Sequence, residues 1–264
     1  MKIGLIIPAA GFSQRYAAGS DYPRSKLDED LGGKSVLQRS IELFTKDDRV
    51  GFIIVAGPHD PAAFAEFKAR HGDKLGFLGA SLCPGGKTHR YETVAAALKE
   101  VPDDCTHIAV HDAARPCTPV ELIERIFDAA ERHKAVIPAI EVSDTLKRIV
   151  ESDRPAQDAD PLAAILGEAA APKKMRLVEK TLDRRDVVAV QTPQVFDTAL
   201  LRRAYAQPDL ASTDDAGLVE RLGEQVVVVD GDLRNIKITR PGDLHLARLI
   251  LNIREDRREA HKRF

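Results

Sequence analysis

The sequence predicts an α/β fold: a Rossmann-like, mainly parallel sheet with helices on both faces and an arm that protrudes from it. Short apolar runs, rich in Ile and Val and bounded by Gly or Pro, alternate along the chain with segments whose apolar residues recur at helical spacing. The length of 264 residues, with 44% hydrophobic and 30% charged residues, suits one large domain with a buried core. We therefore expect residues 1–264 to form a single domain.

The first half of the chain shows the alternation most clearly. Ile3 to Ile7 is a short Ile-rich run ended by Pro8, as expected of a strand that is buried on both faces. The next segment, Ser35 to Phe44, has apolar residues at helical spacing. By the same criteria the following elements are strand Gly51–Ala56, helix Pro61–Arg70, strand Gly76–Cys83, helix His89–Lys99 and strand Thr106–Val110.

The alternation continues in the second half of the chain. The predicted elements are helix Pro119–His133, strand Ala135–Ala139, strand Val187–Ala189, helix Asp197–Tyr205, helix Asp214–Leu222, strand Gln225–Val229 and helix Asp243–Arg254. Alternating strands and helices favour parallel pairing, and ligands of such sheets bind at the carboxyl ends of the strands. We therefore expect the side chains that bind ligands to lie in the loops that follow strands.

One segment interrupts the pattern. Val150 to Lys174 is rich in Ala, Pro and acidic residues, with room for only a short helical stretch in its middle. We interpret it as an excursion from the main domain.

Charge and cysteine content exclude several classes of protein. The formal net charge is −2, so there is no overall positive field to attract nucleic acid, and no apolar run is long enough to be a signal peptide or to span a membrane. Three cysteines without metal-ligand spacing favour neither a zinc site nor a disulfide framework. We expect a cytoplasmic protein whose partners are small molecules.

The first chemical signal is the sequence PAAGFSQR, from Pro8 to Arg15, directly after the first strand. Small residues allow backbone N–H groups to approach a phosphate chain closely, and a nearby basic side chain can neutralise it. Lys26 adds a second cation farther along the chain. The alternative is an ordinary turn, with Lys26 and Arg24 as solvated charges.

The second signal is HDAARP, from His111 to Pro116, directly after another apolar strand. A carboxylate at the carboxyl end of a strand, three residues before an arginine, can hold a metal ion or a substrate hydroxyl beside a phosphate. Asp112 and Arg115 are therefore candidate site residues. The alternative is that Asp112 caps the following helix and pairs with Arg115. We expect His111 to pack or hydrogen-bond locally rather than to act as a base.

Other polar clusters are less specific by themselves. Thr213 with the two aspartates after it is typical of a helix N-terminus, and Lys237 between two isoleucines is compatible with the solvent face of a strand.

Taken in order, these pieces resemble the 2-C-methyl-D-erythritol 4-phosphate cytidylyltransferase family of GT-A-like nucleotidyltransferases, which acts in non-mevalonate isoprenoid precursor synthesis. The resemblance runs from about Lys2 to Ile250. Its motifs are PAAG with Arg15, HDAARP, DT-KR at Asp144–Arg148, TPQ-F at Thr192–Phe196, TD-A at Thr213–Ala216 and NIK-TRP-DL at Asn235–Leu244. The resemblance implies a single nucleotidyltransferase domain whose arm, at about 140–190, takes part in forming a homodimer.

The resemblance also implies roles for individual residues. The nucleotide and its phosphates would contact Pro8, Ala9, Ala10, Gly11, Phe12, Gly85, Gly86, Arg90, Thr93, Asp112, Ala113 and Ala114. Arg15, Lys26 and Lys237 would be catalytic, and Asp112 would hold Mg²⁺ or another divalent cation. The acceptor would contact Asp112, Arg115, Thr145, Arg184, Thr192, Thr213 and Lys237, with Arg184 supplied by the second subunit.

The implied reaction joins two anions. The acceptor phosphate would attack the α-phosphorus of CTP, the co-substrate, and pyrophosphate would leave. Cations must offset the repulsion, and little general-base catalysis is needed because the nucleophile is already ionised.

The sequence departs from the family pattern in two places. The family usually has lysine directly after the proline of the first loop, whereas Pro23 is followed here by Arg24, Ser25 and Lys26. Either cation could grip the triphosphate, although a planar arginine and a point-charge lysine do not bind it equivalently. The second departure is the long Val150–Lys174 stretch.

Three alternative functions remain open on the sequence. One is a cytidylyltransferase for ribitol 5-phosphate, and another is a broader sugar-phosphate nucleotidyltransferase of the same fold. The third belongs to a different class: a non-catalytic regulator that binds a nucleotide.

Overall fold

The structure of the chain is a computed structural model. It describes residues 1–11, 16, 25–155 and 174–253. The chain divides into two compact units, Met1–Ile140 with Val190–Phe264 and Glu141–Ala189.

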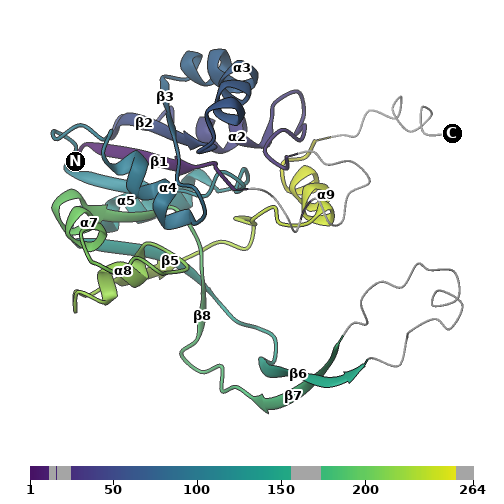
Figure 1. The fold of residues 1–264 in the computed structure, drawn as a ribbon. Helices are drawn as coiled ribbons and strands as arrows, with labels where there is room; N and C mark the ends of the chain where they lie inside the picture. The colour runs from purple at the N-terminus through teal and green to yellow at the C-terminus, as the bar shows by residue number, and fades with distance from the viewer. Residues whose placement is uncertain (12–15, 17–24, 156–173, 254–264) are drawn as a thin grey trace, which may run out of the picture. The chain divides into compact units, whose positions relative to one another are not determined.

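A mixed sheet forms the centre of the first unit (Figure 1). Its strands lie in the order β10-β5-β9-β4-β1-β2-β3, and β8 pairs with β5. All neighbours in this order are parallel except β9, which runs antiparallel to both β4 and β5. The bounds are β1 Ile3–Pro8, β2 Val50–Gly57, β3 Ala80–Pro84, β4 His107–Val110, β5 Ala135–Glu141, β8 Val188–Val190, β9 Gln194–Asp197 and β10 Val227–Asp230.

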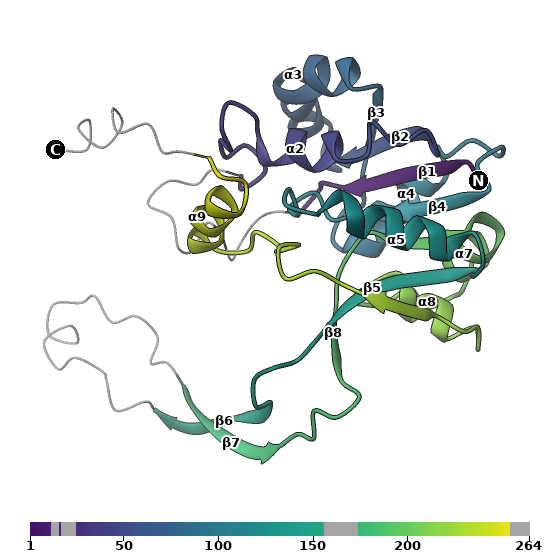
Figure 2. The ribbon, with the colours of Figure 1, turned by 180° about the vertical axis from the view of Figure 1, so that it is seen from behind.

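Helices cover both faces of this sheet, as the sequence predicted (Figure 2). In β1, Ile3, Leu5 and Ile7 belong to one buried cluster and Ile6 to the other, as the alternation of a strand requires. The helices are α2 Val36–Glu42, α3 Pro61–Phe77, α4 Arg90–Leu98, α5 Val120–Ala130, α7 Thr198–Tyr205, α8 Ala216–Glu220 and α9 Pro241–Ile250. Within the described part of the chain, no helix has the length and apolar content needed to cross a bilayer.

The boundary between α3 and β3 differs from the prediction. The sequence predicted a strand from Gly76, whereas α3 continues to Phe77 and β3 begins at Ala80. Leu75 on this last turn of α3 is buried, which favours the longer helix. Gly79 follows the C-cap with φ +75°, a left-handed conformation that ends helices and that glycine adopts without strain.

The sequence analysis missed strand β9. This strand has only four residues, follows Pro193 and has polar residues at both ends, so it lacks a long apolar run. Its central residues Val195 and Phe196 are fully buried between β4 and β5. Tertiary pairing, rather than local preference, makes this segment a strand.

The second unit contains an antiparallel pair of strands, β6 Lys147–Pro155 and β7 Lys174–Thr181. The sequence analysis predicted neither of these two strands. The short helical stretch that it allowed in the middle of Val150–Lys174 lies outside the described residues. Exposed apolar side chains on this pair are Ile149, Val150, Leu177 and Val178.

His111 is a buried residue at the end of β4. Its ring packs edge-on against Phe44 at 4.9 Å between ring centroids, and its two nitrogens lie 3.2 Å from the Arg115 carbonyl oxygen and 3.2 Å from the Thr192 hydroxyl oxygen. Burial lowers the pKa of His111 to about 4, and the nearby Asp112 only partly opposes this shift. The prediction that His111 packs and bonds locally is confirmed.

The lowered pKa predicts a stability loss in mild acid. Between pH 6.5 and 4 an unfolded His111 binds a proton that the folded residue does not, so the free energy of unfolding falls as the pH falls, by up to about 3 kcal/mol for this residue. Denaturant unfolding of the wild type and of His111→Gln across this range measures the difference in slope. The control His133→Gln removes an exposed histidine and should leave the slope unchanged. Equal slopes in all three proteins would contradict the prediction.

Candidate active site

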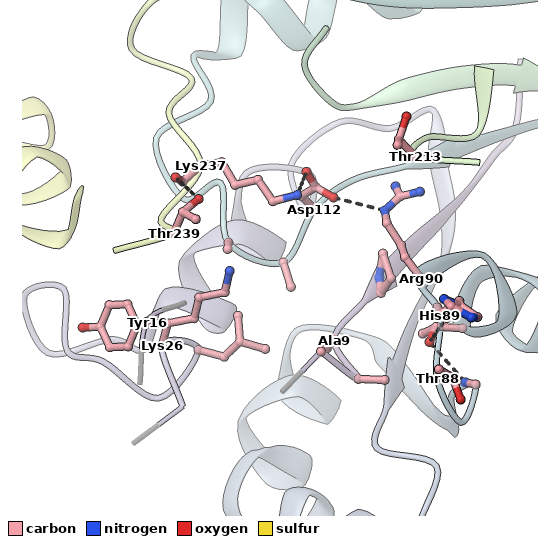
Figure 3. Close-up of a pocket in the computed structure, with 18 of the residues that line it drawn as sticks. Ala9, Tyr16, Lys26, Thr88, His89, Arg90, Asp112, Thr213, Lys237 and Thr239 are labelled. Carbon is pink, nitrogen blue, oxygen red and sulfur yellow. Dashed lines mark hydrogen bonds and ion pairs between the residues drawn. The ribbon is translucent and has the colours of Figure 1, made fainter. Parts of the chain in front are cut away.

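A cavity of about 650 Å³ opens at the carboxyl ends of β1 and β4, where the sequence placed its two main signals. Loops from distant parts of the chain supply its walls (Figure 3). The described lining residues are Pro8, Ala9, Ala10, Gly11, Tyr16, Lys26, Leu27, Gly86, Lys87, Thr88, His89, Arg90, Thr93, Asp112, Ala113, Ala114, Ser212, Thr213, Lys237 and Thr239.

Small residues bring two loops close together beside this cavity. A side chain at Gly85 would come within 2.6 Å of the Gly57 carbonyl oxygen, and one at Gly86 within 2.2 Å of Glu92 Cβ. The Gly86 N–H donates to the Thr93 hydroxyl at 3.1 Å. The glycine pair therefore lets the loop after β3 fold tightly against the start of α4.

The beginning of α4 forms one wall of the cavity. Glu92 accepts hydrogen bonds from the backbone N–H groups of Thr88 at 2.7 Å and His89 at 3.0 Å, which fixes the first turn of the helix. The positive end of the helix dipole thus lies beside Lys87 and Arg90, a setting that attracts anions.

Asp112 is the most strongly paired group of the site. Its carboxylate lies 2.9 Å from Lys237 Nζ, 3.3 Å from Arg115 Nε and 3.4 Å from Arg90 Nε. Burial alone would raise the pKa of Asp112, but Lys237, Arg90 and Arg115 outweigh burial and hold it well below its usual range. Asp112 is the only acidic side chain among the described lining residues.

Arg115 and Thr192 are buried and lie behind Asp112, outside the described lining of the cavity. Arg115 Nη1 donates to the Asn235 carbonyl oxygen at 2.7 Å, and the Thr192 hydroxyl accepts the Asp112 N–H at 3.0 Å. Asn235 Nδ2 in turn donates to the Thr192 carbonyl oxygen at 2.9 Å. The sequence analysis expected both residues around the acceptor and left open that Arg115 pairs with Asp112; the structure shows that pair, and Thr192 also contacts Asp112.

Two lysines enter the cavity from different parts of the chain (Figure 3). Lys26 Nζ donates to the Ile238 carbonyl oxygen at 2.9 Å, next to Lys237. Lys26 is followed by the buried Leu27 and by Asp28, which lies 2.7 Å from His71 of α3. Lys237 belongs to an irregular segment, so its interpretation as the solvent face of a strand is wrong.

The remaining predicted residues have different outcomes. Thr213 lines the cavity. Phe12, Arg15 and Arg24 lie outside the described residues. Thr145 and Arg184 belong to the second unit, where Arg184 Nη1 donates to the Val142 carbonyl oxygen at 3.3 Å.

The sequence analysis missed several residues of the cavity wall: Tyr16, Leu27, Lys87, Thr88, His89, Ser212 and Thr239. Thr239 lies inside the NIK-TRP-DL motif, and each of the others is adjacent to, or between, residues that the sequence analysis named, so proximity in sequence was the available signal. Tyr16 directly follows PAAGFSQR, and burial with a contribution from Glu29 raises its pKa to about 12.

Comparison with known proteins identifies the family of the chain. The family model described as 2-C-methyl-D-erythritol 4-phosphate cytidylyltransferase (IspD) matches residues 3–165 and 157–253. A protein of that name from Frankia casuarinae is 35% identical over 251 residues, which cover 95% of this chain and 81% of the relative. One from Rhodococcus jostii is 36% identical, with 93% of each chain covered.

Solved structures give the same result. The crystal structure of 2-C-methyl-D-erythritol 4-phosphate cytidylyltransferase from Thermus thermophilus matches with a TM-score of 0.67 and 30% identity, over 96% of this chain and 100% of that one. Since the family model and relatives above 30% identity both cover most of the sequence, the chain belongs to the 2-C-methyl-D-erythritol 4-phosphate cytidylyltransferase family.

Proposed function

We propose that the cavity transfers the cytidylyl group of CTP to 2-C-methyl-D-erythritol 4-phosphate, which yields 4-diphosphocytidyl-2-C-methyl-D-erythritol and pyrophosphate. The observation that carries this proposal is the cluster of Lys237, Arg90 and Arg115 around Asp112, next to a small-residue loop. The family's name describes this chemistry. A site whose described lining carries several cations and one carboxylate, that of Asp112, suits two phosphorylated reactants.

The reaction needs charge compensation more than proton transfer. An oxygen of the acceptor phosphate attacks the α-phosphorus of CTP, the bond from that phosphorus to the bridging oxygen breaks, and the electron pair leaves with pyrophosphate. Lys26 and Lys237 reach the cavity from different segments and would hold the two anions near each other. Arg15 is proposed to assist them.

The nucleotide would occupy the part of the cavity formed by Pro8–Gly11 and the loop after β3. The Arg90 guanidinium is a suitable partner for its oxygens. Thr213 and Lys237 would contact the acceptor. Thr145 and Arg184 are proposed to complete the acceptor site, with Arg184 supplied by a second copy of the chain.

Asp112 could also hold a magnesium ion. Mg²⁺ in nucleotide enzymes is commonly bound by one or two carboxylates together with substrate phosphates, so one carboxylate fits. Among the residues that the structure describes, no group of three acidic, histidine or cysteine side chains forms a metal site without a substrate. The ion would neutralise phosphate charge when bound with CTP, while Asp112 would anchor it.

The first experiment offers the wild type CTP with either 2-C-methyl-D-erythritol 4-phosphate or D-ribitol 5-phosphate and records pyrophosphate release, with ATP, GTP and UTP as nucleotide controls. We expect release with CTP and the methylerythritol phosphate. A preference for ribitol phosphate would move the acceptor to the alternative, and CTP binding without any release would indicate the non-catalytic regulator.

Removal of one cation tests the charge-compensation model. Lys26→Ala should lower kcat/KM about 100-fold, because a preorganised cation contributes roughly 3 kcal/mol to the transition state. The matched control is Lys34→Ala, which removes a surface lysine paired with Glu42 at 2.7 Å and should change kcat/KM little. Near-normal kcat/KM in Lys26→Ala would remove Lys26 from the mechanism.

The arm is proposed to form a homodimer. A two-stranded hairpin is at best marginally stable by itself, and Ile149, Val150, Leu177 and Val178 expose apolar surface that a second chain could cover. Light scattering should give twice the chain mass for the wild type and a lower mass for Val178→Lys. Phe77→Lys, which changes an exposed apolar residue of the main unit, is the control. A wild-type monomer at micromolar concentration would contradict the proposal.

A further inference from the structure

Asp215 is a fully buried carboxylate that none of the proposed roles uses. One of its oxygens accepts a hydrogen bond from Arg90 Nη1 at 2.8 Å, and the other accepts one from the Tyr205 hydroxyl. Arg90 is a cavity residue, whereas Asp215 and Tyr205 lie outside the described lining. A buried charge is costly unless it is paired, so Asp215 and Arg90 hold each other in place.

The backbone around Asp215 is fixed by Gln194 of β9. Gln194 Oε1 accepts the N–H groups of Asp215 at 3.2 Å and Ala216 at 3.1 Å, and its Nε2 donates to Asp214 Oδ2 at 2.8 Å. Gln194 is itself fully buried. The TPQ and TDDA sequence motifs therefore meet in one hydrogen-bonded turn, which directly follows the cavity residues Ser212 and Thr213.

The Arg90 guanidinium contacts two carboxylates at different distances. Its Nη1 contact to Asp215 is 2.8 Å, whereas its Nε contact to Asp112 is 3.4 Å. Figure 3 shows the guanidinium between Asp112 and Thr213. Asp215 thus makes the closer contact and counteracts the electrostatic attraction of the Arg90 guanidinium to Asp112.

Arg90 also retains hydrogen-bonding capacity. Its Nη2 is buried and has no hydrogen-bond partner in the part of the chain that the structure describes. A buried cationic donor without a partner destabilises the folded protein, and arginines with a purely structural role are normally satisfied. Burial disfavours the charge on Arg90, but Asp215 and Asp112 outweigh burial and raise its pKa above the ordinary value.

We propose that Asp215 is a positioning residue for nucleotide binding: with Tyr205 and Gln194 behind it, it holds the Arg90 guanidinium in the cavity wall and away from full contact with Asp112. Without the Asp215 charge, the Arg90 guanidinium would move into full contact with Asp112 and would no longer be available to bind the ligand. The identity of that ligand, CTP, rests on the proposed function.

Calorimetric titration with CTP in the absence of the acceptor tests this proposal directly. Asp215→Asn keeps the shape of the side chain but removes its charge, and should weaken CTP binding about 10-fold. Tyr205→Phe removes only the hydroxyl and should weaken binding in the same direction by about 3-fold. The control is Gln207→Leu: Gln207 Nε2 bridges the Ala204 and Leu218 carbonyl oxygens between α7 and α8 but does not touch Asp215. Its CTP affinity should equal that of the wild type.

A double-mutant cycle separates positioning from a general structural effect. If Asp215 acts through Arg90, the double variant Arg90→Ala with Asp215→Asn binds CTP no more weakly than Arg90→Ala alone. Additive losses, or unchanged affinity in Asp215→Asn, would overturn the proposal. If circular dichroism shows Asp215→Asn to be unfolded, Tyr205→Phe takes its place in the cycle with the same criteria.

Failure of this inference differs from failure of the proposed function. A wild type that binds CTP but releases no pyrophosphate with either acceptor contradicts the proposed reaction, while the binding cycle still tests Asp215. Full turnover by the wild type with an additive cycle contradicts the positioning role alone. Absence of CTP binding by the wild type contradicts both.

Discussion

The ionised carboxylate of Asp112, buried at the end of β4, is the group around which the cavity is arranged. A buried carboxylate is tolerated only when cations and hydrogen bonds replace water. Here Lys237, Arg115 and Arg90 supply the cations, and Thr192 accepts the Asp112 N–H. The chain segments that carry these residues must come together before the carboxylate can be buried.

Each of the two arginines is held in place by a different hydrogen-bond acceptor outside Asp112. Arg115 is tied to the backbone of Asn235, and Arg90 to Asp215 of the turn before α8. Lys237 is the most exposed of the three cations, with 38% of its side chain accessible. A rigid pair of arginines and a more accessible lysine can thus neutralise Asp112 without closing the cavity to a ligand.

Strand β9 links this electrostatic centre to the fold. It lies antiparallel between β4 and β5, so Thr192, just before the strand, lies beside Asp112, and Gln194 reaches the turn at Asp215.

Positive charge is concentrated at the cavity although the chain as a whole is slightly negative. The chain as a whole carries a formal −2, yet Lys237, Arg90 and Arg115 surround the buried carboxylate of Asp112, and Lys26 lines the same cavity. Anionic substrates respond to this local field rather than to the total charge.

Local sequence patterns were enough to predict the α/β class, most helices and parallel strands, and the two loops that carry Pro8–Gly11 and Asp112. These features follow from local periodicity and from short motifs at strand ends, which a linear chain displays directly. The family also followed from the order of its motifs.

The folded structure was needed to identify Gln194–Asp197 as a strand, to place Thr192 beside Asp112 and to link Arg90 to Asp215. Arg90 and Asp215 are 125 residues apart in sequence. No local pattern encodes such a pairing, because it arises when two buried charges from distant segments must neutralise each other in the same core.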